Sequence, residues 1–141
     1  MIVERDENMV ALRFDDGEDL MPRLLETLGD TTSAVIISAV GMLRDFEIGW
    51  LGPEGYEKKR FHEPCEILSL SGTVNRQQDG KPFIHTHASL AGKDHSVIGG
   101  HLFSATVNFT CEMVFLVPQG LAFERKVIVE GEPMRFFPGK K

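Results

Sequence analysis

The chain has 141 residues, of which 42% are hydrophobic and 26% are charged, and its formal net charge is −6. A chain of this length and composition can bury a core of its own, so it does not depend on disulfides to fold. A domain that binds DNA by itself is usually basic, because phosphate neutralisation supplies most of the affinity, so the acidic balance argues against that class.

Cysteine usage and the first residues favour a cytoplasmic protein with no membrane partner. Cys65 and Cys111 are too few for a disulfide framework, and each lies in an apolar run, which predicts two buried, reduced thiols. Charges at positions 4 to 7 come before the apolar core of a signal peptide could form. The longest apolar stretch, residues 34–43, is far shorter than the roughly 18 residues that span a bilayer.

The first elements in the chain are a strand and a helix. Residues 9–14 alternate weakly between apolar and polar, which indicates a strand. Residues 19–28 then place leucines at helical spacing, which predicts a helix with one buried face. Pro22 falls in the first turn, where its missing N–H costs little, and Gly29 stands where a helix C-cap is expected.

The rest of the chain reads as strands joined by tight turns. The expected strands are residues 33–40, 43–51, 56–61, 66–75, 83–90, 104–117 and 122–129, with 56–61 as a charged edge strand. Strands that follow one another through short turns favour antiparallel pairing. We therefore expect a single α/β domain of the α+β kind over residues 1–141, with a central, mainly antiparallel sheet and one helix packed on it.

Three histidines form the candidate site. His85 and His87 lie two residues apart in a strand, so their side chains leave the same face. Residues 92–94 turn the chain and residues 96–101 return it. If the turn pivots on Asp94, His87 stands directly opposite His101, and the three rings converge. A pivot shifted by half a residue would place His101 opposite Thr86 and send it to the other face.

Such a trio of imidazoles suits a metal. Three histidines are a familiar zinc set and leave a fourth position for water or a substrate, although nickel, copper or ferrous iron would fit as well. His62 and His95 are interpreted as surface residues rather than ligands. The pair Gly99–Gly100 would allow the strand to bend, leaving room beside the third ring for a ligand or for a close backbone.

Three charged residues have a functional and a structural interpretation. Glu66 and Glu112 lie in strand runs and could act as a general base near a metal, but a structural ion pair is the favoured role for each. Arg44 could bind an anion near the site, although an ordinary salt bridge is favoured.

Several ordered motifs resemble one known family. They are Cys-Glu-Ile-Leu-Ser-Leu-Ser-Gly at 65–72, Asp-Gly-Lys-Pro-Phe-Ile-His-Thr-His at 79–87 and Gly-Gly-His-Leu at 99–102, with Ile-Ser-Ala-Val-Gly at 37–41 upstream. In this order they resemble the PPC domain (plant and prokaryote conserved, DUF296), and the likeness runs from about Met9 to Phe136. The chain looks like the free-standing prokaryotic type.

The resemblance implies an α/β domain with a mainly antiparallel sheet, assembled as a homotrimer, with zinc held by His85, His87 and His101. It also implies a binding, assembly or regulatory module with protein partners and a link to transcription. The alternative is a metal-dependent enzyme acting on a small molecule. Direct DNA binding ranks last because of the acidic charge, and the Arg-Gly-Arg-Pro element that the family's plant members use does not occur here.

Overall fold

The computed structural model describes residues 1–141. It contains one helix and a single nine-stranded sheet. In chain order the elements are β1 (Ile2–Arg5), β2 (Met9–Asp15), α1 (Leu20–Leu28), β3 (Ala34–Gly52), β4 (Gly55–Phe61), β5 (Cys65–Arg76), β6 (Pro82–Ala91), β7 (Val97–Leu116), β8 (Leu121–Lys126) and β9 (Arg135–Lys140).

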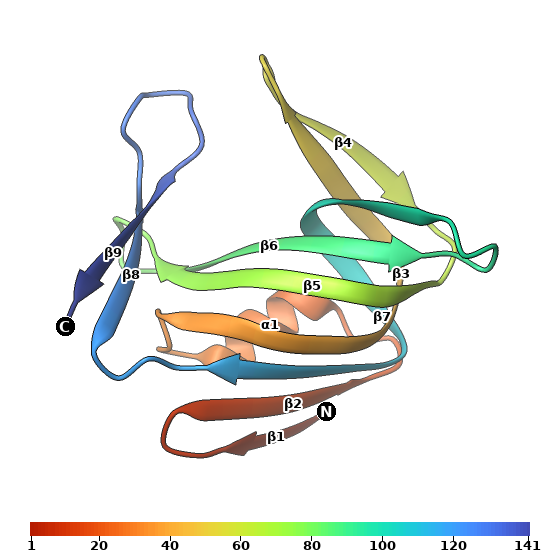
Figure 1. Cartoon of the computed structure of the whole chain (residues 1–141), viewed down its shortest axis with the longest axis horizontal. Coiled ribbons are helices and arrows are strands. Elements are labelled where there is room, and N and C mark those ends of the chain that lie inside the picture. The colour runs from red at the N-terminus through yellow and green to blue at the C-terminus, as the bar shows by residue number, and fades with distance from the viewer.

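Long strands β3 and β7 form the centre of the sheet. They pair with each other along most of their length, and β7 also pairs with β2 through its C-terminal half and with β6 through its N-terminal residues. The strand pairs β3–β5, β5–β6, β6–β7 and β7–β3 form a closed circuit, so β6 lies between β5 and β7 (Figure 1). All strand pairs are antiparallel except the single contact of Arg76 with Glu124, which joins β5 to β8 in parallel.

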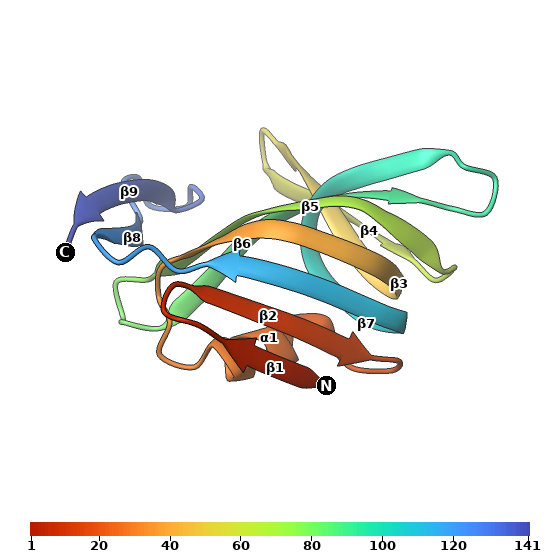
Figure 2. The same ribbon diagram turned by 60° about the horizontal axis from the view of Figure 1, so that its bottom comes forward.

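The helix α1 covers one side of the sheet, as Figure 2 shows. Its buried side chains are Leu20, Leu24 and Leu28, which are at most 2% exposed, as their spacing predicts. Gly29 ends the helix with φ 54°, and its N–H donates to the carbonyl of Leu25. Burying three leucines on one face fixes α1 against the sheet, because each contributes on the order of 2 kcal/mol.

The expected fold class is confirmed: the chain is a single domain with a mainly antiparallel sheet and one helix. Two expected strands, 33–40 and 43–51, are one continuous strand, β3, whose pairing with β7 is interrupted by bulges. The expected strand 104–117 begins earlier, at Val97. The charged strand β4 pairs only with β3, as expected of an edge. Strands β1 and β9 were not predicted.

Both cysteines are buried and free, as the sequence predicted. Burial raises the pKa of Cys65 and raises that of Cys111 to about 12. The sole helix, α1, has nine residues and falls well short of what a bilayer crossing requires.

Candidate metal centre

The register of the β6–β7 hairpin decides whether the histidines meet. His87 pairs directly with His101, so the register in which the three rings share a face is the one observed. Two glycines allow this packing, because a Cβ at Gly99 would lie 2.6 Å from the carbonyl oxygen of Ala88, and a Cβ at Gly100 would lie 2.7 Å from that of Gly49. The expected close backbone approach at this pair is therefore present.

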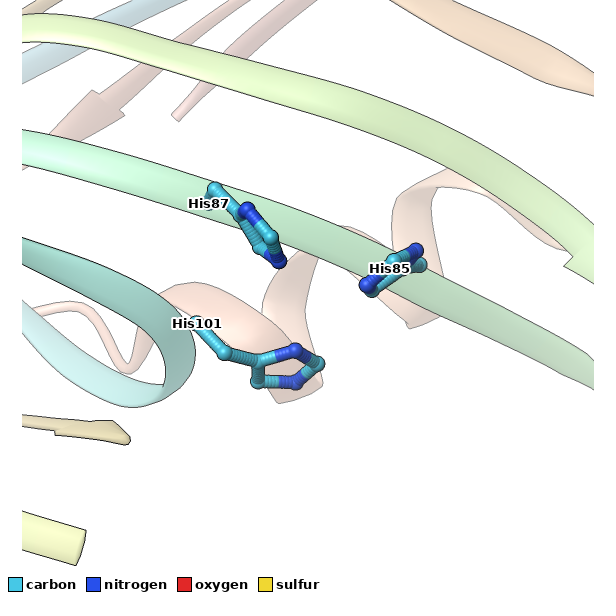
Figure 3. A group of neighbouring side chains, drawn as sticks. All are labelled: His85, His87 and His101. Atoms are coloured by element: carbon cyan, nitrogen blue, oxygen red, sulfur yellow. The ribbon is translucent and has the colours of Figure 1, made fainter. Parts of the chain in front are cut away.

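The three rings are turned toward a common space. Figure 3 shows His85 and His87 projecting from β6 and His101 from the neighbouring β7. The ring centroids are 5.0 Å apart for His85–His87, 5.2 Å for His85–His101 and 5.6 Å for His87–His101. One ring nitrogen from each residue lies within 4.8 Å of the other two. Tetrahedral zinc would need these nitrogens about 3.4 Å apart, so the rings would have to move closer together around an ion.

Burial keeps two of the rings uncharged. His101 is only 8% exposed, His85 is half-buried, and His87 is exposed. Burial, followed by the nearby Arg125 charge, lowers the pKa of His85 to about 4. Burial, followed by the charge of His87, likewise lowers the pKa of His101 to about 4. Both imidazoles are therefore neutral at pH 7, the form whose nitrogen lone pair binds a metal.

Aromatic side chains support His101 from the side. The Phe103 ring lies 4.4 Å from the His101 ring, and the Tyr56 ring packs on both, with centroids 5.0 and 5.1 Å away. The Tyr56 hydroxyl lies 3.4 Å from His101 Nδ1. The Lys58 ammonium lies 4.1 Å above the centre of the Phe103 ring. These contacts restrict the His101 ring, as the groups around a metal ligand usually do.

The sequence matches the Plants and Prokaryotes Conserved (PCC) domain family over residues 1–117. The chain belongs to this family. This is the same family as the PPC domain that the sequence motifs resemble. No curated protein has a matching sequence.

Several solved structures share the whole fold of this chain. A metal-containing protein from Archaeoglobus fulgidus is 40% identical, with a TM-score of 0.81 and coverage of 97% of this chain and 99% of the other. A PPC protein from Pyrococcus horikoshii is 28% identical, with a TM-score of 0.81 and coverage of 94% and 92%. A protein from Bacteroides thetaiotaomicron proposed to bind DNA is 17% identical, with a TM-score of 0.83 and coverage of 96% of each chain, which shows the fold alone.

The sequence analysis missed three residues that contact the histidines: Tyr56, Phe103 and Arg125. Phe103 could have been found, since it lies two residues after His101 on the same strand face. No pattern in the sequence pointed to Arg125, because β8 reaches this part of the sheet through a single parallel contact. Its Nη2 lies 2.6 Å from His85 Nδ1. Arg125 also lies beyond the residues matched by the PPC family.

The other weighed residues lie outside the histidine cluster. His62 contacts Asp45 Oδ1 at 2.8 Å, and His95 is exposed in the hairpin turn, so neither is a ligand of this group. The ion pairs expected for Glu66 and Glu112 are wrong: both side chains are on the outward face of their strands and exposed, and neither forms a salt bridge. Arg44 pairs with Asp16 instead of facing the histidines.

Proposed function

We propose that this PPC protein binds a divalent transition metal, with zinc as the best-fitting ion, through His85, His87 and His101, and that it acts as a homotrimeric binding module. The observation that carries the proposal is the convergence of three ring nitrogens within 4.8 Å, two of them on imidazoles whose pKa is about 4. The 40% identical relative from Archaeoglobus fulgidus, described as metal-containing, supports it.

The residues present fit zinc by their chemistry. The cluster offers three imidazole nitrogen donors and no carboxylate, a set that zinc accepts and that calcium and magnesium do not prefer. When bound, the ion would offer its fourth position to water or to a ligand. The protein's own part is to hold the rings: His85 and His101 stay neutral, and Phe103 and Tyr56 fix the plane of His101.

An apolar outer surface supports the trimer. Ile37, Val40 and Leu68 are 54%, 57% and 55% exposed on the central strands β3 and β5. Phe109 is 77% exposed and has a φ of 66°, a conformation that bulky side chains seldom adopt. Large apolar side chains gathered on the surface often mark a protein interface. We infer that part of it is covered by further copies of the chain, in a cytoplasmic protein.

An enzymatic role is the less favoured alternative. A metal-dependent hydrolase needs a base within hydrogen-bond reach of the metal-bound water. The two carboxylates considered for that role, Glu66 and Glu112, are exposed and stand outside the histidine cluster. Autonomous DNA binding remains last, on the net charge of −6.

Metal content tests the proposal directly. Substituting His87→Ala should remove most of the metal from the purified protein, because two imidazoles bind zinc far more weakly than three. With metal removed by a chelator from both proteins, the stability of the variant should lie within about 0.5 kcal/mol of the parent, since the His87 side chain is exposed. Elemental analysis of both proteins, after expression in zinc-supplemented medium, measures the difference.

The matched control is His95→Ala, which changes an exposed histidine of the same hairpin outside the cluster. This variant should keep the metal content of the parent. Equal metal in the parent and in His87→Ala would contradict the proposed site.

Assembly is tested separately by light scattering coupled to size exclusion. We expect three times the chain mass of 15.8 kDa at micromolar concentration. A monomer under these conditions would contradict the trimer and leave the metal site untouched.

A further inference from the structure

Arg125 is a buried cation without a counter-charge. The residue is 9% exposed, and it takes part in no salt bridge. Its Nη1 donates to the carbonyl oxygen of Met134 at 3.3 Å, and its Nη2 contacts His85 Nδ1 at 2.6 Å. Its Nε is buried and has no hydrogen-bond partner. A buried guanidinium lacking a carboxylate is costly, so an arrangement of this kind favours an anion that can approach it.

The contact between Arg125 and His85 determines which ring nitrogen of His85 carries the proton. A guanidinium only donates hydrogen bonds, so His85 Nδ1 must accept with its lone pair, and the proton of the neutral ring must be on Nε2. A neutral imidazole has one lone pair and one N–H. The contact therefore uses the same lone pair that a metal would need.

This conflict holds whichever nitrogen of His85 meets the metal. If Nδ1 binds, Arg125 has to leave that nitrogen. If Nε2 binds, the proton moves to Nδ1, and two donors face each other across 2.6 Å. Arg125 must give up the contact with His85 in both cases, and its guanidinium is then free beside the histidines.

No aspartate or glutamate forms a hydrogen bond or an ion pair with Arg125. The two carboxylates that line the same pocket as Arg125 have other partners: Glu124 pairs with Lys126, and Asp79 accepts from the backbone N–H of Lys81. The histidine cluster itself contains no carboxylate, and the Lys58 ammonium lies above the Phe103 ring beside it. A divalent ion would add two more positive charges. The positive charge at the histidine cluster therefore has no directly bonded protein anion, which favours an anionic ligand from solution.

We propose that Arg125 holds the lone pair of His85 in the metal-free protein and, in the metal-loaded protein, binds a small oxyanion of the carboxylate or phosphate class at the histidine cluster. This inference rests on the metal site proposed above. It assigns Arg125 two roles: it weakens metal binding by competing for His85, and it selects an anionic ligand, which a guanidinium recognises through paired hydrogen bonds.

The competition is tested with zinc affinity, measured against a chromophoric chelator. Arg125→Met keeps the length and apolar stem of the side chain and removes the charge. We expect it to bind zinc about tenfold more tightly than the parent, because the metal no longer has to displace a charged hydrogen bond. Arg125→Lys, which keeps the charge, should stay closer to the parent. Unchanged affinity in Arg125→Met would overturn the competition.

Anion binding is tested on the cobalt-substituted protein, whose visible spectrum reports the ligands of the metal. Acetate and sulfate are titrated separately, with sodium perchlorate holding the ionic strength constant. We expect the parent spectrum to change and saturate with at least one of them, and Arg125→Met to need roughly tenfold more anion. A response to acetate alone assigns the carboxylate class, and a response to sulfate alone assigns the phosphate-like class.

The matched control is Arg44→Met, which removes a half-buried arginine remote from the cluster. It should leave zinc and anion affinities unchanged. Equal anion affinity in the parent and in Arg125→Met would overturn the anion role. Failure of the parent to bind zinc or cobalt at all would instead contradict the proposed metal site, so the two failures are distinguishable.

Discussion

Two arginines of this domain lie in opposite electrostatic settings. Arg44, on β3, donates from Nη1 to Asp16 Oδ1 at 2.7 Å and to Asn108 Oδ1 at 2.9 Å. Arg125, on β8, is more buried and has a histidine nitrogen and a carbonyl as its partners. The hydrogen bond with Asp16 raises the pKa of Arg44, whereas burial lowers the pKa of Arg125.

The difference separates a structural charge from a functional one. Asp16 also accepts a hydrogen bond from the backbone N–H of Phe109, whose φ is 66°, so the Arg44 pair holds the irregularity of strand β7 at Phe109 in place. This cluster satisfies its own charges and needs nothing from solution. The Arg125 cluster does not, and an unbalanced buried charge beside neutral metal-type ligands indicates that a ligand completes it.

The largest expected difference between the two regions is in how their stability responds to acid. The folded-state pKa of His85 and of His101 is about 4, below the usual 6.5, so the unfolded chain binds their protons more readily. The contribution of the two neutral rings to the stability of the folded state is fully present above pH 6.5 and is lost as the pH falls toward 4. We expect Tm of the metal-free protein to fall by roughly 5 °C or more over this range.

Asp16 behaves in the opposite way, because its pKa is lowered by the hydrogen bond from Arg44. Its contribution is present above pH 3.8 and is lost only below that value, so the two regions lose stability in different pH windows. Thermal unfolding in a chelator between pH 4 and pH 7 measures the first window. His85→Gln should reduce the slope and His95→Gln should not; a flat profile for the parent would contradict the assigned burial of the rings.

The histidine site was largely predictable because its geometry is local. A short turn connects β6 and β7, and the alternation of a strand decides which side chains share a face. Whether His101 faced the other two rings depended on a shift of half a residue in the hairpin turn, which the sequence left open. The structure pairs His87 with His101, and the close packing of Gly99 and Gly100 on neighbouring backbone is compatible with that register.

Long-range features were not predictable in the same way. Arg125 reaches His85 from a strand that touches β5 at one residue pair, and no periodicity encodes such a contact. The six residues of β9 are all exposed, so they lack the apolar alternation that identifies a strand. Glu66 and Glu112 were wrongly expected to be paired, because strand-like sequence does not say which face is turned to solvent.

The smallest expected effect is on unfolding stability when each of the two arginines is replaced by methionine. Arg44→Met removes hydrogen bonds to Asp16 and Asn108 and leaves Asp16 with the backbone N–H of Phe109 alone, so we expect a lower free energy of unfolding than in the parent. Arg125→Met removes an uncompensated buried charge and fills its place with an apolar chain, a change that is often neutral or stabilising. Urea unfolding in a chelator at pH 7 should therefore give a lower midpoint for Arg44→Met and an equal or higher one for Arg125→Met. If Arg125→Met is the more destabilised of the two, Arg125 is a structural residue like Arg44, and its orphaned Nε is no sign of a ligand.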